Sequence, residues 1–118
     1  MNSQQPKDKQ LSVADDFSPF PAGRFHDDGE FNGTRFREDF LVPALQALEP
    51  AGHLIVTFEG VAGLGSSFLD EAFGGLVRVD GYSKERLDEC LEISAGADHE
   101  LDDFVELALR YIQRAAEG

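Results

Sequence analysis

The strongest constraint on the fold is a short apolar segment that is followed at once by glycines. Residues His53 to Phe58 read His-Leu-Ile-Val-Thr-Phe, and Gly60, Gly63 and Gly65 come directly after them. A nearly continuous run of apolar and β-branched residues is typical of a strand covered on both faces. The glycine-rich turn leads straight into a helix start at Ser66. The sequence therefore predicts a central strand, a turn and a helix, in the order found in α/β domains.

The rest of the chain alternates between strand-like and helix-like patterns. Polar residues 1–10 predict a disordered tail, and 11–118 predict a single domain because the length suits one compact unit. The expected elements are a weak strand at 11–14, a helix from about 34 to 48, strands at 77–80 and 91–94, and helices at 84–90 and after Asp98. This order predicts an α/β domain with a small mixed or largely parallel sheet of about four strands and four helices.

Several residues predict local details of these elements. Asn32 or Thr34, Ser83 and Asp98 are expected to cap helices, and Pro43 is expected to kink or divide the first one. Asp28-Gly29 predicts a tight turn between Phe25 and Phe31. Ser67 and Asp70 have the spacing of a capping box. Gly74-Gly75 disfavours a helix unless that helix must approach the sheet or a partner backbone closely.

The charge balance excludes some partners and favours others. With 23 acidic and 10 basic residues, the formal net charge is −13. Nucleic acids and anionic membranes bind mainly through clustered Lys and Arg, so neither is expected as a partner. A basic protein surface is the better match, although the acidic C-terminal part is also typical of a solvated helical face. With no apolar run near membrane-spanning length and no signal segment, we expect a cytoplasmic protein.

The residue inventory argues against most enzyme chemistry. Cys90 is the single cysteine, which predicts a buried structural thiol, and His26, His53 and His99 have no spacing that joins two of them in a metal site. We therefore expect no metal and no cofactor. Gly63-Leu-Gly65-Ser66-Ser67 lacks the third glycine of the dinucleotide fingerprint and the lysine of a phosphate loop. A hydrolase that uses Ser66 as nucleophile is the third and weakest of the functional hypotheses, after an interaction module and an anion-binding domain, because no histidine base is identified beside Ser66.

Two serines and two arginines remain as candidate functional residues. Ser66 and Ser67 stand at the start of a helix, where a hydroxyl either caps the helix or accepts a phosphoryl group. Arg24 and Arg37 either pair with nearby carboxylates or hold an anion above the Gly65-Ser66 turn. If the arginines hold an anion, the alternative function is an anion- or nucleotide-binding domain built on the glycine-rich turn.

The segment from Ser66 to Leu76 reads Ser-Ser-Phe-Leu-Asp-Glu-Ala-Phe-Gly-Gly-Leu. Together with the preceding strand, it resembles the hallmark of the STAS-like domain family of unknown function. Upstream residues also match the family's pattern, and the resemblance covers roughly Leu11 to Ile112. The matching residues are Asp15-Asp16-Phe17, Gly23-Arg24, Asp28-Gly29, Asn32-Gly33, Phe36-Arg37-Glu38 and Leu41-x-Pro43-Ala44-Leu45.

The resemblance implies a STAS-like fold and a non-catalytic regulatory module of bacterial signalling. STAS domains include the anti-sigma-factor antagonists, in which a histidine-kinase-like ATPase phosphorylates a serine at the start of the helix after the central strand. That position corresponds to Ser66, with Ser67 beside it, although Gly65 stands where the antagonists normally have aspartate. We expect a protein partner, either such an ATPase or an anti-sigma factor, to bind the surface formed by Gly63, Leu64, Gly65, Phe68, Asp70, Glu71, Gly74 and Gly75.

Overall fold

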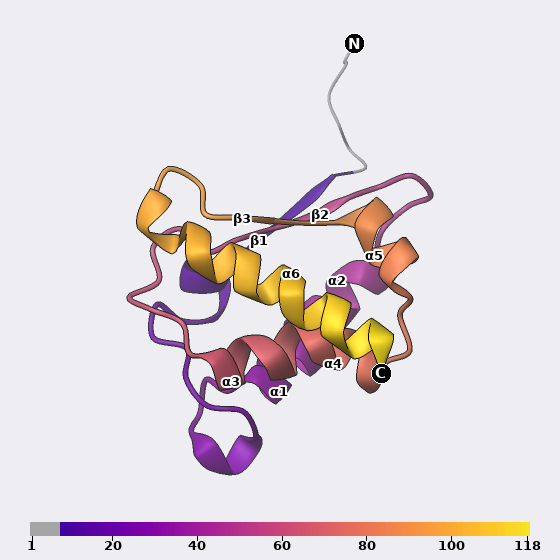
Figure 1. The fold of residues 1–118 in the computed structure, drawn as a ribbon. Coiled ribbons are helices and arrows are strands. Elements are labelled where there is room, and N and C mark those ends of the chain that lie inside the picture. The colour runs from indigo at the N-terminus through magenta and orange to yellow at the C-terminus, as the bar shows by residue number, and fades with distance from the viewer. Residues whose placement is uncertain (1–7) are drawn as a thin grey trace.

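The computed structural model of the chain describes residues 8–118. Within them lies a three-stranded parallel sheet in the order β1-β2-β3, formed by β1 (Lys9–Ser12), β2 (Leu54–Thr57) and β3 (Leu91–Ser94). Leu54 aligns with Lys9 on one side and with Leu91 on the other, so β2 is the central strand as predicted. Figure 1 shows the sheet along one side of the molecule and the helices on the other. The predicted α/β class is confirmed.

The helices cover one face of the sheet only. Along β2, Leu54 and Val56 are buried while Ile55 and Thr57 are half-buried, which is the alternation of a strand with one open face. In register with Ile55 and Thr57, the open face carries Gln10, Ser12, Glu92 and Ser94. The prediction that β2 is covered on both faces was wrong, because half of its apolar run faces a polar surface rather than a second helical layer.

The first long helix runs from residue 33 to residue 46 as α1 (Gly33–Phe36), η3 (Arg37–Leu41) and α2 (Val42–Gln46). The Asn32 side chain caps it by accepting a hydrogen bond from the Arg35 N–H. Pro43 lacks an N–H and crowds the preceding turn, and the helix accommodates it by widening into the π-helical turn η3. Pro43 thus perturbs the helix, as predicted, without ending it.

The second long helix runs from residue 66 to residue 78 as α3 (Ser66–Leu69), η4 (Asp70–Gly74) and α4 (Gly75–Arg78). It continues through Gly74 and Gly75, so the strand predicted at 77–80 was wrong: Val77 and Arg78 belong to α4, and Val79 and Asp80 form a turn. Gly74 and Gly75 are both buried, which shows that close packing outweighs their low helix propensity. The sheet therefore has three strands among residues 8–118, not four.

The remaining elements follow the predicted order. Ser83 caps α5 (Lys84–Cys90), and the Asp98 side chain caps the short η5 (His99–Leu101), which continues into α6 (Asp102–Glu117). Short helical turns also lie at η1 (Val13–Phe17) and η2 (His26–Asp28). Cys90 is buried as predicted, and burial raises the pKa of its thiol. The part of the chain that the structure describes holds no helix long and apolar enough to span a membrane.

The N-terminal boundary differs from the prediction. The first strand is Lys9–Ser12 rather than 11–14, so Lys9 and Gln10 belong to the sheet and not to a tail; residues 1–7 lie outside the described residues.

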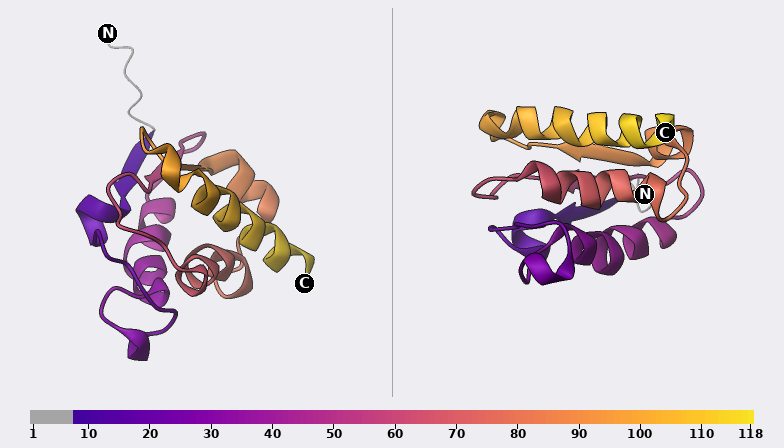
Figure 2. Two further views of the ribbon diagram at one scale, coloured as in Figure 1. Left: turned by 60° about the vertical axis from the view of Figure 1, so that its left-hand side comes forward. Right: turned by 60° about the horizontal axis from the view of Figure 1, so that its bottom comes forward.

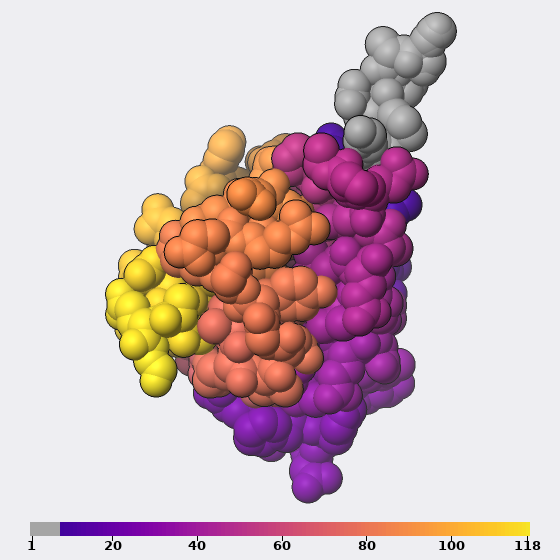
Figure 3. Space-filling view, turned by 90° about the vertical axis from the view of Figure 1, so that its right-hand side faces the viewer, coloured from indigo at the N-terminus to yellow at the C-terminus, as the bar shows by residue number. Residues whose placement is uncertain are grey.

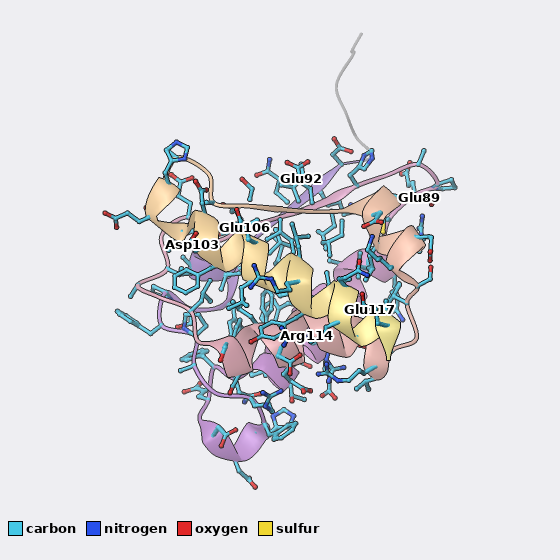
Figure 4. The ribbon with its side chains drawn as sticks, viewed as in Figure 1. Glu89, Glu92, Asp103, Glu106, Arg114 and Glu117 are labelled. Atoms are coloured by element: carbon cyan, nitrogen blue, oxygen red, sulfur yellow. The ribbon has the colours of Figure 1, made fainter. Side chains whose placement is uncertain are left out.

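At the opposite edge of the sheet, α6 covers β3, and its acidic side chains point away from the core (Figure 4). Asp103 and Glu106 lie on α6, Glu89 on α5 and Glu92 on β3, and all are exposed, as a solvated acidic face requires.

The two ends of the parallel sheet are built differently. Figure 2 shows the helices side by side over the sheet, with the connections from the carboxyl ends of the strands gathered at one end. Those connections are the segments 13–32, 58–65 and 95–101. At the amino ends, α5 lies beside the segment that follows α2 (Figure 3). Ligands of open α/β sheets bind at the carboxyl ends of the strands, so the first end is where a site is sought.

Candidate functional site

The segment from Gly63 to Ser67 stands open at the carboxyl end of the central strand. Ser66 and Ser67 are exposed in the first turn of α3, and within residues 8–118 neither hydroxyl makes a hydrogen bond. Nothing lies within 4 Å of the position where a Cβ atom would stand on Gly63 or Gly65. The structure thus places two free hydroxyl groups on a segment with open space around it.

The predicted capping box at this helix start was wrong. Gly65 is the N-cap residue, with an extended backbone and no side chain to accept a hydrogen bond, so neither serine caps the helix. Asp70, expected to reach back to the cap, is instead held by two arginines. The capping interpretation that competed with a functional role therefore does not account for Ser66 or Ser67.

Deeper along the same helix, a buried ion pair joins the two long helices. Arg37 in η3 and Glu71 in η4 have side chains only 3% and 7% exposed, and Arg37 Nη2 lies 2.7 Å from Glu71 Oε2. Arg37 Nε also donates to the Glu71 backbone oxygen at 3.0 Å, and Nη1 donates to Asp80 at 2.9 Å. Burial lowers the pKa of Arg37, but the hydrogen bonds that it donates to Glu71 and Asp80 and the negative charges of these acids outweigh burial and raise the pKa overall. All three nitrogen atoms of the Arg37 guanidinium therefore donate hydrogen bonds within the protein.

Three glycines make room for this contact between the helices. A Cβ atom on Gly75 would stand 2.5 Å from Arg37 Nε, and one on Gly33 would stand 2.8 Å from the Phe68 backbone oxygen. A Cβ atom on Gly74 would meet Arg78 and Asp70 side chains at 2.8 Å and lie 3.4 Å from the Tyr111 oxygen of α6. The predicted close approach at Gly74-Gly75 is confirmed, but it is made to an arginine and to α6 rather than to the sheet.

Between the open serines and the buried pair lies Asp70. Its carboxylate bridges two arginines: Oδ2 lies 2.7 Å from Arg24 Nη1, and Oδ1 lies 2.9 Å from Arg78 Nη1. Burial raises the pKa of Asp70, but the hydrogen bonds and charges of the two arginines outweigh it and hold the pKa below its usual value. Arg24 is therefore joined to the helix at Asp70, one turn beyond Ser66, whereas the Arg37 guanidinium is buried.

The predicted partner surface is divided by burial. Gly63 is half-buried, Gly65 is exposed and Asp70 is half-buried, so these positions are accessible. The other five predicted contact residues are buried and cannot meet a partner directly: Leu64, Phe68, Glu71, Gly74 and Gly75. The physical reason is that Leu64 and Phe68 belong to the core, Glu71 pairs with Arg37, and the two glycines lie where α6 and Arg37 come close to the helix. The predicted anion role of Arg37 is likewise contradicted, because its guanidinium is 3% exposed and bound to Glu71 and Asp80.

Sequence reasoning missed three members of the polar network. Thr34 places its hydroxyl 3.0 Å from Glu71 Oε2 and 3.0 Å from the Arg24 backbone oxygen, while Arg78 and Asp80 complete the pairs of Asp70 and Arg37. Arg78 lies eight residues after Asp70, a spacing of about two helical turns that places both residues on one face of a helix. This spacing was missed because the sequence pattern at 77–80 predicted a strand.

The fold places the protein in the class of α/β domains with a parallel sheet, in which the central strand leads through a glycine-rich turn into a helix. Comparison with protein families matches residues 32–94 to the STAS-like domain of unknown function (DUF4325). Because the match spans more than half of the chain, the protein belongs to that family. Searches of curated proteins and of solved structures found no match.

Proposed function

We propose that this STAS-like domain is a non-catalytic protein-interaction module of bacterial signalling, similar to an anti-sigma-factor antagonist, which is switched by phosphorylation of Ser66 or Ser67. The observation that carries the proposal is the placement of both serines, which are exposed, neither capping the helix nor hydrogen-bonded within residues 8–118. A free, accessible hydroxyl can accept a phosphoryl group without loss of a structural contact. The partner in this proposal is a protein, either a histidine-kinase-like ATPase or an anti-sigma factor.

The histidines support a non-catalytic role. His26 lies 3.7 Å from a Glu38 oxygen, His53 is 3.1 Å from Asp8, and His99 is 3.3 Å from Asp102. In the described part of the chain none of the three hydrogen-bonds to a serine, so no nucleophile and base pair of the kind that activates a serine is present there. This arrangement disfavours the hydrolase that ranked third.

The carboxylates near the serines favour the switch. Asp70 and Glu71 lie one helical turn away, where bare negative charges would repel a phosphate. Asp70 is paired with Arg24 and Arg78, however, and Glu71 is buried against Arg37. A phosphoserine here adds about −1.5 to −2 charges beside a carboxylate that is already neutralised, and it lies within reach of the helix amides.

No observation favours the anion- or nucleotide-binding alternative. Arg37 is sealed in the core, and Arg24 is engaged with Asp70. The glycine-rich turn alone lacks a free cation to neutralise a bound phosphate, so the interaction module remains the single proposed function.

The proposal is tested with immobilised protein and extracts of cells that make it. The variants are Ser66→Ala/Ser67→Ala, Ser66→Asp/Ser67→Asp and a control, Ala97→Asp/Ala116→Asp, which adds the same two charges at exposed positions elsewhere. We expect quantitative mass spectrometry to find a partner that the wild type, the alanine variant and the control retain. The Ser66→Asp/Ser67→Asp variant should retain about tenfold less. Equal retention by all four proteins would refute the switch.

A further inference from the structure

The loop between β1 and the first long helix displays two aromatic side chains in water. Phe20 is 70% exposed and Phe25 is 54% exposed, while Phe36, Phe58, Phe68 and Phe73 are fully buried. Exposed phenylalanine lowers solubility, and aromatic residues, phenylalanine among them, are enriched at protein interfaces relative to the rest of the surface. Figure 1 shows that the part of this loop that contains η2 projects from the body of the molecule near the start of α3.

The loop is held in a defined shape. The Asp28 carboxylate accepts hydrogen bonds from the N–H groups of Arg24 and Phe25, at 3.1 and 2.9 Å. The Ala22 N–H donates to Phe31, and the Gly33 N–H donates to Gly23, both at 2.9 Å. Gly23 has a φ of +96°, a conformation that favours glycine. Because these bonds fix the backbone of the loop, less backbone entropy is lost when a partner binds to it.

Two contacts fasten this loop to the segment that carries the serines. The Ala62 N–H donates to the Pro19 oxygen at 2.8 Å, next to Phe20. Arg24, which lies over the Phe25 ring at 5.9 Å, is paired with Asp70 one turn beyond Ser66. Phe20 and Phe25 therefore belong to the same end of the molecule as Gly63 to Ser67.

The charges around the two aromatic residues indicate what they bind. Residues 15–39 contain seven acids and three bases, a balance of 3 − 7 = −4. One of the bases, Arg37, is buried against carboxylates, and Arg24 is paired with Asp70. The acids nearest to Phe25 along the chain are exposed: Asp27, Asp28 and Glu30. A partner that covers this surface must offer apolar contact for the rings and positive charge for the rim.

We propose that Phe20 and Phe25 anchor the partner, and that the partner's contacting segment is basic and carries apolar side chains. This inference rests on the proposed function, which it deepens by naming the docking surface and the chemistry of the segment that binds it. Arg24 pairs with Asp70 and lies over the Phe25 ring, so it joins the helix that carries the serines to the aromatic loop.

A selection from a library of random short peptides, displayed on phage and panned against the full-length protein, tests the inference without knowledge of the partner. Peptides that are enriched are synthesised and titrated by fluorescence anisotropy against the wild type and against Phe20→Ser/Phe25→Ser. The matched control is Val79→Ser/Leu109→Ser, which removes two exposed apolar side chains elsewhere, 63% and 48% exposed. Circular dichroism verifies that both variants keep the fold.

We expect enriched peptides to combine Lys or Arg with apolar residues. Their affinity should fall at least about tenfold in the Phe20→Ser/Phe25→Ser variant, stay unchanged in the control and weaken with added salt. Peptides that bind the Phe variant as tightly as the wild type, peptides without basic residues, or a failure to enrich any peptide would overturn the docking surface. Loss in the control alone would also overturn it, because the binding surface would then include α6 or the turn after α4, where Leu109 and Val79 lie. Each of these results leaves the serine switch to the capture experiment, so the two proposals fail separately.

Discussion

The helix that follows the glycine-rich turn has two halves that the sequence presents as one motif and the structure separates. Its first two residues, Ser66 and Ser67, are exposed and make no side-chain hydrogen bonds within the described residues. Its middle, with Glu71, Gly74 and Gly75, is buried against Arg37 and α6. The difference teaches that one continuous motif can hold buried structural positions beside exposed ones: the second half packs against the rest of the fold, and the first half carries the two serines that we propose as the switch.

The largest effect should come from breaking the buried half. Replacing Arg37 with methionine leaves the buried Glu71 carboxylate with only the Thr34 hydroxyl and a longer, 3.8 Å contact to Arg78, and it also removes the bond to Asp80. We expect a loss of about 3–5 kcal/mol in the free energy of unfolding, measured by urea denaturation. Restoring charge balance with Arg37→Met/Glu71→Met should recover part of that loss. A cost for the single variant within 0.5 kcal/mol, on the order of a surface change, would show that the pair does not hold the helices together.

A smaller effect should distinguish Gly75 in the buried half from Gly63 in the turn before the helix. In Gly75→Ala the new methyl group would stand 2.5 Å from Arg37 Nε, so the arginine must shift, and we expect a loss of about 1–3 kcal/mol. In Gly63→Ala nothing lies within 4 Å, and the change should stay within about 0.5 kcal/mol. Thermal and urea unfolding of both variants checks the contrast, and equal costs would contradict it.

Asp70, between the two halves, should give the protein a measurable acid sensitivity. The pKa of Asp70 is lower in the folded protein than in the unfolded chain. The ionised Asp70 carboxylate therefore stabilises the fold at pH values above the unfolded pKa of about 3.9, and this stabilisation is lost as the pH falls through the pKa of the folded protein. We expect Asp70→Asn to cost about 1 kcal/mol near neutral pH, a gap that narrows below about pH 4. Asp39→Asn, an exposed aspartate without an ion pair in residues 8–118, is the control, and it should show no such gap.

The smallest effect should appear at the serines. Because neither hydroxyl holds a structural contact within residues 8–118, Ser66→Ala and Ser67→Ala should each change the free energy of unfolding by no more than about 0.5 kcal/mol. Urea denaturation of the two variants tests this expectation. A larger destabilisation would mean that the first turn is structural after all, and the contrast between the halves would disappear.

Local patterns predicted the elements well where a single residue type decides the outcome. Asn32, Ser83 and Asp98 cap helices because a short polar side chain before a helix satisfies a free N–H, whatever surrounds it. The errors arose where packing decides. The strand expected at 77–80 is a helix end because Arg37 and α6 hold Gly74-Gly75 in helical conformation, and no local preference of those residues reveals it.

The candidate site divides in the same way. The sequence by itself determined the α/β class, the central strand and the place of two serines at the start of the following helix, because periodicity and turn chemistry are local. Only the tertiary structure decided that Arg37 pairs with Glu71, that Arg24 pairs with Asp70, and that Phe20 and Phe25 stand beside the serine segment. Those contacts join residues 34 to 46 positions apart, and burial and charge pairing over such separations depend on how the helices pack.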